Sequence, residues 1–473
     1  MKRTMILMLT LLVTWSCSVG RQIQSPEYNP TVPAALQTPP AERFNAREPV
    51  AAWWSQLEDE QLVTLVSEAL AHNHDVRVAL ANLDEARALT RGIKRDRLPT
   101  IGVNAAAQQQ RSSDEGLFGP LPDRDSELYD VGFEASWELD LFGRVRNRIL
   151  AGEARLRMAE ADVQGVYVSV AVETARAYID LRGAQYRLDV AQRNAANQRK
   201  THELILALAD AGRGDQLNVA RARTQLELTQ AGIPILSAEI NAVLNRLALL
   251  TGDTVPDLRD QLAAVKPLPT LPDSVAVGDA RGLLARRPDI RRAEHALAEA
   301  TARYNLNVAE LYPKVSLFGS LGFSATSLGD LAGASALTGG IGPRLQWSAF
   351  NLGRVRAHID AADARTRAQL ATFERSVLAA LHETDAAMVG LTRAEESRAR
   401  LREAAKAGAE AVELARLRFD AGVDDFLDVL DAERTLLLAE ERLAQGEIET
   451  VQNLINVYQA LGGGWQTAAD SGS

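Results

Sequence analysis

Two aspartates near the end of the chain are spaced so that both carboxylates lie on one face of a helix. Asp428 and Asp431 lie three positions apart after a turn predicted at Gly422, so on a helix they share one face near its tip. Around a threefold axis such a pair gathers six carboxylates, which in a narrow water-filled constriction select cations and repel one another unless cations, protons or basic groups offset them. An ordinary solvated helix face explains the same residues, and the residues by themselves favour that simpler interpretation.

No arrangement of residues indicates an enzyme or a nucleic-acid-binding surface. His72 and His74 are the closest of six histidines, with no cysteine or aspartate cluster at metal-ligand spacing, and they are better explained as surface residues. No Gly-x-Ser-x-Gly nucleophile motif occurs. The glycine-rich run 339–342 lacks the helix and lysine of a phosphate-binding loop and fits a flexible strand entry. The net charge of −10 argues against nucleic acid. We expect no catalytic residue, metal site or cofactor.

Arginines and aromatic residues form a second candidate group, an anchor at a membrane interface. Arg144 and Arg354 each follow a glycine at which a predicted strand gives way to a predicted helix. Amphipathic rings and long guanidinium side chains that reach toward the headgroups are typical of such an interface. Solvation of a helix start explains the arginines equally well. The aromatic members of the group are Trp137, Phe142, Trp347 and Phe350.

The sequence contains an internal duplication that must organise these residues. The segment 137–146 returns 210 residues later as 347–356, and upstream an offset of 214 carries Pro99 onto Pro313. A period this long indicates one duplicated structural unit rather than a solenoid of short repeats. Other equivalent pairs at the offset of 210 are Glu173 and Glu383, Gly212 and Gly422, Asp215 and Asp425, and Gly252 and Gly462.

Long helices are predicted in both copies. Proline is absent between Pro122 and Pro234 and again after Pro343, and alanine, leucine, arginine and glutamate dominate these stretches. A helix over 143–211 would reach about 100 Å, and a second helix over 215–252 would run back along it. Rods of this length cannot bury their apolar stripes alone, so we expect them to pack as coiled-coil-like pairs and with other subunits.

Two strands are predicted in each copy, between the helices. Over 130–140 the residues alternate strictly between apolar and polar, and 314–324 shows a similar apolar face. Segments of about ten residues with one apolar and one polar face are typical of a transmembrane β-barrel, although a soluble antiparallel sheet has the same period.

The number of strands predicts the number of subunits. Four strands cannot close a barrel, because the smallest membrane barrels need about eight. Two copies would give eight strands and a plugged interior, whereas three give twelve strands and an open lumen, which suits the acidic inner face of the strand at 130–140. We therefore predict a mainly α fold with a small β part, in which a duplicated long-helix unit forms a trimeric α-barrel and a 12-stranded transmembrane β-barrel.

The N-terminus has the pattern of an export signal. Lys2 and Arg3 precede a short apolar run over 5–13, which is too short to span a bilayer. Cys17, the only cysteine, falls where the run ends and is predicted to be the lipid acceptor of a bacterial lipoprotein. Cleavage after Ser18, which would discard the cysteine, is the alternative.

These features divide the chain into six segments. The predicted segments are a signal peptide with its lipid-acceptor cysteine (1–17), a proline-rich tether (18–52), a first repeat (53–262), a linker (263–277), a second repeat (278–463) and a C-terminal tail (464–473).

The segments 137–144, 287–294 and 419–432, together with their order, spacing and duplication, resemble the TolC-like outer-membrane efflux factors, lipoprotein branch. The resemblance runs from Trp53 to Gly463. It implies a homotrimer, lipid-anchored in the bacterial outer membrane, with a helical tunnel across the periplasm. It also implies a periplasmic adaptor and an inner-membrane pump of the resistance-nodulation-division (RND) type as partners, and drugs or other small toxic compounds as cargo.

The resemblance changes the interpretation of the aspartates near the turn. It implies that Asp428 and Asp431 close the periplasmic entrance of the channel. Members of the family carry an arginine and a tyrosine where this chain has Asp424 and Phe419, and an aspartate of the first copy is replaced by Asn218. The basic partner of the gate must therefore differ, and Arg221 or Arg223 could supply it.

Two alternative functions remain open at this stage. One is an exit duct for secreted polypeptides, as in type I secretion. The other is a structural coiled-coil lipoprotein of the envelope, with the strands as a soluble sheet. The strict alternation over 130–140 argues against the structural protein.

Overall fold

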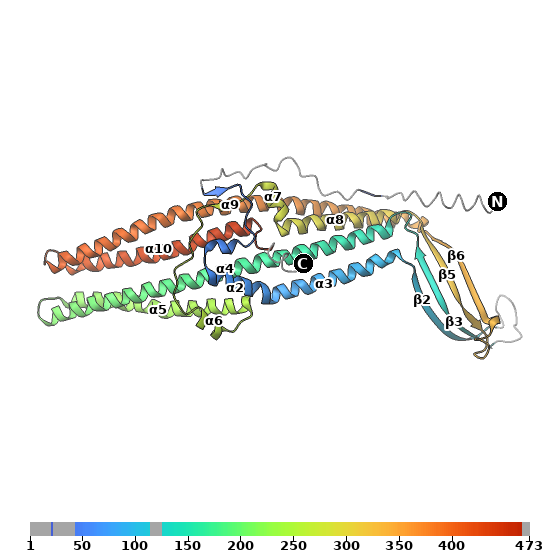
Figure 1. Ribbon diagram of the computed structural model, residues 1–473, viewed down its shortest axis with the longest axis horizontal. Helices are drawn as coiled ribbons and strands as arrows, with labels where there is room; N and C mark the ends of the chain where they lie inside the picture. The colour runs from blue at the N-terminus through green and yellow to red at the C-terminus, as the bar shows by residue number, and fades with distance from the viewer. Residues whose placement is uncertain (1–19, 22–42, 114–124, 466–473) are drawn as a thin grey trace. The chain divides into compact units, whose positions relative to one another are not determined.

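The computed structural model describes residues 20–21, 43–113 and 125–465, which group into two compact units (Figure 1). Unit 1 comprises residues 83–159 and 292–374 with the N-terminal residues 20–21. Unit 2 comprises 43–82, 160–291 and 375–465. The fold is mainly α with a small β part, as predicted. Cys17 and the predicted signal lie outside the described residues.

Unit 1 contains the one large sheet found in the described part of the chain. Its four antiparallel strands follow the order β2-β3-β5-β6, two from each copy of the repeat. The strands are β2 (Thr100–Arg111), β3 (Asp125–Glu138), β5 (Lys314–Ala325) and β6 (Leu337–Gln346).

The strand predicted over 130–140 ends earlier than the alternation suggested. β3 stops at Glu138, and the carboxylate of Asp140 instead accepts hydrogen bonds from the backbone N–H groups of Val145 and Arg146, both at 2.7 Å. Asp140 therefore caps the first turn of the following helix, where unpaired N–H groups need an acceptor.

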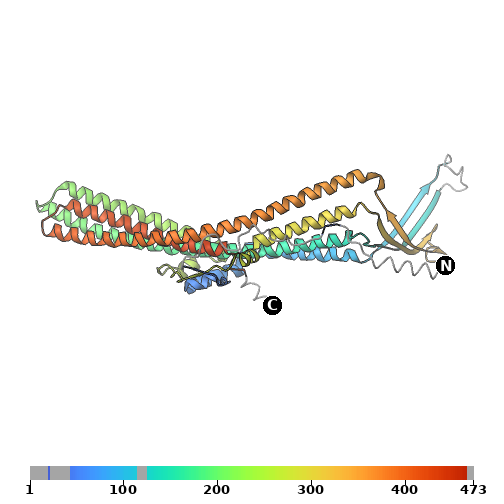
Figure 2. The same cartoon turned by 90° about the horizontal axis from the view of Figure 1, so that it is seen from above.

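The long helices and their hairpins were predicted correctly. Helix α4 has 67 residues and α9 has 69, and each turns back into a shorter partner, α5 or α10. The two hairpins of unit 2 lie side by side in both views (Figures 1 and 2). The bounds are α4 (Arg144–Asp210), α5 (Gln216–Thr251), α9 (Leu352–Asp420) and α10 (Phe426–Ala460).

Both hairpin turns are built in the same way. Gly212 and Gly422 have φ of 72° and 70°, a left-handed conformation that glycine adopts without strain. In the second turn the N–H groups of Gly422 and Val423 donate back to the carbonyls of Phe419 and Arg418, the pattern of a Schellman motif. Asp215 and Asp425 then cap the returning helices. The duplication thus extends to individual hydrogen bonds.

Shorter elements complete the core of unit 2. Trp53 is fully buried and stacks on Tyr458, with ring centroids 5.0 Å apart. Parts of the predicted tether and linker pair here, because β1 (Phe44–Asn45) and β4 (Val275–Ala276) form a small parallel sheet. The remaining helices among the described residues are η1 (Trp53–Leu57), α2 (Glu60–His72), α3 (His74–Lys94), η2 (Arg95–Arg97), α6 (Val255–Gln261), α7 (Ala280–Arg286), α8 (Pro288–Ala309), η3 (Ala334–Ala336) and η4 (Ala349–Asn351).

One buried side chain in each repeat donates a hydrogen bond to a carbonyl at the C-terminal end of the returning helix. Asn73 Nδ2 donates to the carbonyl of Leu250 at 3.0 Å, and Arg287 Nη1 donates to the carbonyl of Ala460 at 2.9 Å. The offsets of 214 and 210 carry the first pair onto the second. Arg287 also binds the carboxylate of Glu383 at 2.7 Å. These contacts satisfy helix carbonyls that would otherwise lack a donor.

Removal of the Arg287 side chain is expected to destabilise unit 2. Breaking a buried ion pair costs about 3–5 kcal/mol, but Glu383 is 58% exposed, so water replaces part of the lost contact and we expect about 2 kcal/mol. Arg287→Ala should therefore lower the midpoint of thermal unfolding, followed by far-UV circular dichroism. Arg393→Gln, which removes an exposed pair with Glu396, is the control and should leave the midpoint unchanged. Equal midpoints for both variants would contradict the assignment.

Candidate functional site

Asp428 and Asp431 project from the first turns of α10. Both side chains are exposed, whereas Phe426 and Val429 in the same turns are each 3% exposed. The two buried residues pack in a cluster with Ile205 of α4 and Ala222 of α5. This packing fixes the rotation of α10 and holds the two carboxylates on the opposite side, in solvent.

Asp424 has a different environment from the other two aspartates. The guanidinium of Arg418 donates to both of its carboxylate oxygens, with an Nη2–Oδ1 distance of 2.8 Å, and these hydrogen bonds hold the pKa of Asp424 below its usual range. Asp431 accepts a hydrogen bond from Arg434 at 2.6 Å, in a pair whose two side chains are both largely exposed. The carboxylate of Asp424 is therefore paired within its own hairpin turn, whereas the carboxylate of Asp431 is paired only in an exposed ion pair with Arg434.

The first hairpin presents different residues at the equivalent positions. The offset of 210 carries Asn218 onto Asp428 and Arg221 onto Asp431. Asn218 is half-buried and Arg221 is exposed. Within one subunit, one hairpin tip therefore carries a pair of carboxylates and the other carries an amide and a guanidinium.

A buried polar contact joins the two hairpins close to the tips. The carboxylate Oε1 of Glu433, which is 8% exposed, accepts a hydrogen bond from Arg416 at 2.7 Å and one from Thr201 at 3.3 Å. These residues could not be identified from the sequence. No local motif marks them, because Thr201 and Glu433 are 232 positions apart.

The predicted interface residues lie where the sheet meets the helices. Trp137 Nε1 donates to the carbonyl of Arg97 at 3.0 Å, and the equivalent Trp347 Nε1 donates to the carbonyl of Leu311 at 3.1 Å. The rings remain 38% and 51% exposed. Their polar groups are satisfied and their faces are open, as in the aromatic belts of membrane proteins.

The other predicted anchors differ in their freedom. Arg144 is engaged by Glu138, with an Nε–Oε1 distance of 2.8 Å, so its guanidinium is occupied by a protein carboxylate rather than free for lipid. Phe142 stacks on Tyr312 with ring centroids 4.8 Å apart. Phe350 and Arg354 are exposed. The aromatic residues thus fit the interface better than Arg144 does.

The sheet exposes one apolar face. Strand register places Val103, Phe133 and Leu321 side by side, with exposed fractions of 72%, 59% and 58%. Other large apolar residues exposed on this face are Ile101, Trp137, Phe323, Leu337, Ile341 and Leu345. The neighbouring positions, which point to the opposite face, include Asn104, Glu134, Ser320, Ser324 and Arg344. An exposed apolar face this large indicates contact with lipid.

Helix α5 is the one helix in the described part of the chain that is long and apolar enough to cross a membrane by length and composition. Leu244 and Leu247 of α5 are buried in the core of unit 2. The exposed face of the sheet is therefore the better candidate for the lipid contact.

Comparison with known proteins finds relatives along nearly the whole chain. The profile of the family described as outer membrane efflux protein matches residues 65–253 and 281–463. The toluene efflux pump outer membrane protein TtgI of Pseudomonas putida is 29% identical over 486 residues, covering 99% of this chain and 100% of the relative. The outer membrane protein OprJ of Pseudomonas aeruginosa is 30% identical, covering 90% of this chain and 88% of its own length.

Solved structures agree with these relatives. The outer-membrane channel OprN matches with a TM-score of 0.90 at 38% identity, covering 95% of this chain and 100% of that chain. The open state of the Neisseria gonorrhoeae MtrE outer membrane channel matches with a TM-score of 0.82 at 27% identity, covering 95% of this chain and 99% of that chain.

Proposed function

The chain belongs to the outer membrane efflux protein family, and from this premise we propose how it builds its channel. It is an outer-membrane efflux channel whose long helices extend into the periplasm. In our proposal three copies surround one pore. The exposed apolar face of the sheet is the observation that carries this function, since a soluble coiled-coil scaffold would have no use for it.

The outer strands of the sheet support closure by several copies. β2 and β6 stand at its two ends and, within the described residues, each pairs along one edge only. Because the four strands alternate in direction, β6 of one copy is antiparallel to β2 of the next, so the sheets can join in a ring. Three copies give twelve strands and an open lumen.

Light scattering on the purified protein tests the number of subunits. We expect a protein mass close to three times the 51.3 kDa of the chain, together with conductance in planar bilayers. A protein that stays in the soluble fraction would contradict the channel, and a mass of two chains would contradict the trimer.

The proposed partners are a periplasmic adaptor and an inner-membrane pump of the RND type, with small toxic compounds as cargo and no catalytic role for this chain. Support comes from relatives named for the efflux of toluene, of solvents and of cations. A type I secretion duct is the alternative. Deletion of the gene should sensitise cells to small toxic compounds and leave polypeptide secretion unchanged. The reverse result would favour the secretion duct.

Lipidation of Cys17 is part of the proposal and has indirect support from Arg21. The Arg21 N–H donates to the side-chain carbonyl of the buried Asn305, and Asn305 Nδ2 donates back to the Arg21 carbonyl, both at 2.8 Å. The guanidinium of Arg21 binds Asp363 at 2.8 Å and lies 4.5 Å over the ring of Tyr304. The chain four residues after Cys17 is thus held against unit 1, which also carries the sheet.

The mature protein is expected to begin at an acylated Cys17. Mass spectrometry of the N-terminal peptide should show the added acyl mass, and Cys17→Ser should remove it. Ser18→Ala, which leaves the cysteine in place, serves as the control and should retain the acyl mass. A mature chain that begins at Val19 would refute the assignment.

The last part of the proposal is a gate of alternating charges. Around a threefold axis six hairpin tips form a ring, and the internal repeat places Asp431 and Arg221 at equivalent points on alternating tips. Each Asp431 would then face an Arg221 of a neighbouring tip, which offsets the repulsion among the carboxylates. Asp428 and Asn218 form a second level of the same ring.

A further inference from the structure

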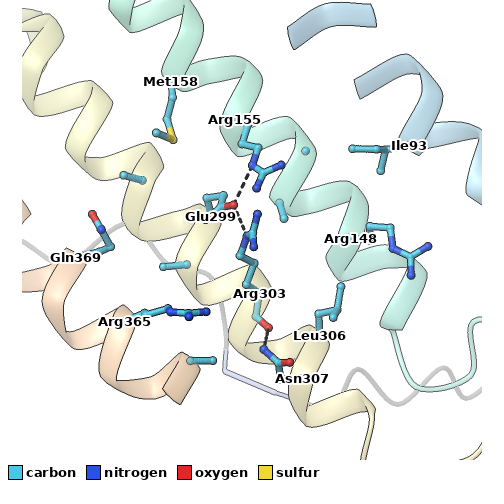
Figure 3. Close-up of a pocket in the computed structure, with 15 residues that line it drawn as sticks. Ile93, Arg148, Arg155, Met158, Glu299, Arg303, Leu306, Asn307, Arg365 and Gln369 are labelled. Atoms are coloured by element: carbon cyan, nitrogen blue, oxygen red, sulfur yellow. Dashed lines mark hydrogen bonds and ion pairs between the residues drawn. The ribbon is translucent and has the colours of Figure 1, made fainter. Parts of the chain in front are cut away.

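A hollow in unit 1 is lined by four arginines. It has a volume of about 660 Å³ and lies between α4, α8 and α9, with one residue from α3 (Figure 3). Arg148 and Arg155 come from α4, Arg303 from α8 and Arg365 from α9. We call these four residues the arginine site.

Carboxylates offset only half of this charge. Glu299 is the one acidic residue in the lining, and a single oxygen, Oε1, accepts hydrogen bonds from both Arg155, at 3.0 Å, and Arg303. Arg148 pairs with Asp96 at 2.9 Å, outside the lining. For Arg365, no ion pair is seen with any residue that the structure describes. Two guanidiniums are therefore left in excess.

The carboxylate of the hollow is largely buried, since the side chain of Glu299 is 17% exposed, and burial raises its pKa although Arg155 opposes the shift. The side chains of Arg155 and Arg303 are about half exposed. Guanidinium groups at such half-buried positions attract an anion more strongly than they would on a fully open surface. Two further polar residues, Asn307 and Gln369, also line the hollow. The rest of the wall is apolar and consists of Ile93, Met158 and Leu306 with Ala151, Gly152, Ala296, Ala300 and Ala362.

The hollow opens on the face of the helices that is opposite to Arg21. Arg303 and Asn305 are two positions apart on α8, which places them about 200° apart around the helix. Asn305 and Asp363 hold Arg21 on one face, whereas Arg303 and Arg365 line the hollow on the other. In the proposed trimer a lipid-anchored N-terminus lies outside the channel, so the hollow opens toward the lumen.

We propose that the arginine site binds an amphipathic organic anion, with a carboxylate, sulfonate or phosphate head and an apolar body of drug size. Guanidinium forks match these planar or tetrahedral anions with paired hydrogen bonds, and the apolar wall takes the body. The volume lies within the range of small-molecule sites. The inference relies on the proposed channel only for the side on which the site opens, since binding itself needs only the folded protein.

Binding can be measured by ¹⁹F NMR with 4-(trifluoromethyl)benzenesulfonate on the delipidated full-length protein in amphipol. Arg303→Gln/Arg365→Gln is expected to weaken binding at least about tenfold. Glu299→Gln should strengthen it severalfold, because it frees two guanidiniums that the native carboxylate occupies. A gain of affinity on removal of this negative charge is not expected of a merely structural role.

The matched control is Arg157→Gln/Arg356→Gln, which removes two exposed arginines of α4 and α9 outside the lining. It should bind the sulfonate as the native protein does. The uncharged 4-(trifluoromethyl)benzenesulfonamide should bind at least about tenfold more weakly than the sulfonate. Equal binding of the two probes, or equal loss of binding in both double variants, would overturn the proposal.

Native mass spectrometry before delipidation distinguishes two sources of the anion. An anionic phospholipid that is retained by the native protein and the control, but lost from Arg303→Gln/Arg365→Gln, identifies a lipid ligand. Sulfonate binding without retained lipid identifies a site for molecules in transit. Either result supports the site, while conductance of the same preparations tests the channel separately.

Discussion

Arginine at position 321 is expected to prevent assembly in the outer membrane, whereas arginine at position 320 is expected to be tolerated. Leu321 lies in the middle of β5 beside Phe133, on the exposed apolar face of the sheet. An arginine that faces lipid near the middle of a bilayer costs about 2–4 kcal/mol in each copy, and a trimer would bear this cost three times. Ser320 points to the other face, where an arginine would meet Glu134 across the strand pair.

The two variants differ by one position and introduce the same side chain, so each controls for the other. The Leu321→Arg protein should be absent from the outer-membrane fraction. It should also no longer give the heat-modifiable band that the unboiled native protein gives on a denaturing gel. Ser320→Arg should keep both properties. If both variants assemble equally well, the apolar face does not contact lipid and the sheet has another role.

Much of the fold could be predicted because the sequence contains the same structural unit twice. The repeat at an offset of 210 residues aligns Gly212 with Gly422. In the structure these two glycines have φ values of 72° and 70° and form the same kind of turn. Hydrophobic alternation identified β3 and its exposed face. Alternation does not report hydrogen bonding, however, and this is why Asp140 was assigned to the strand when its carboxylate caps α4.

Side chains that meet across helices could not be predicted from the sequence. Glu433, which pairs with Arg416 of its own hairpin, also accepts a hydrogen bond from Thr201 of the other hairpin. Arg155 meets Glu299 at a separation of 144 positions. Which residues face each other there depends on the relative rotation and register of long helices. A periodic apolar stripe fixes the buried side of a helix but leaves the polar partners along its edges undetermined.

Removal of the two carboxylates at the proposed gate is expected to have the largest effect on channel function. Asp428→Ala/Asp431→Ala is expected to raise single-channel conductance by about twofold or more and to relieve block by divalent or trivalent cations added from the periplasmic side. Both side chains are exposed and their rotation is fixed by the buried Phe426 and Val429. In a narrow ring the six aspartates bind cations that plug the entrance, so their removal takes away both the binding site and the pairing with Arg221.

Charge exchange separates a gate from a charged surface. Arg221→Asp should open the entrance much as Asp428→Ala/Asp431→Ala does, because three carboxylates then replace the three guanidinium groups of Arg221 in the ring. Arg221→Asp/Asp431→Arg should restore the native conductance, since the charges still alternate. Glu413→Ala/Asp420→Ala removes two exposed carboxylates from α9 and should change nothing. On a solvated face all four variants would conduct alike, because separated surface charges are screened. If correctly assembled variants behave in this way, the constriction must lie elsewhere in the channel.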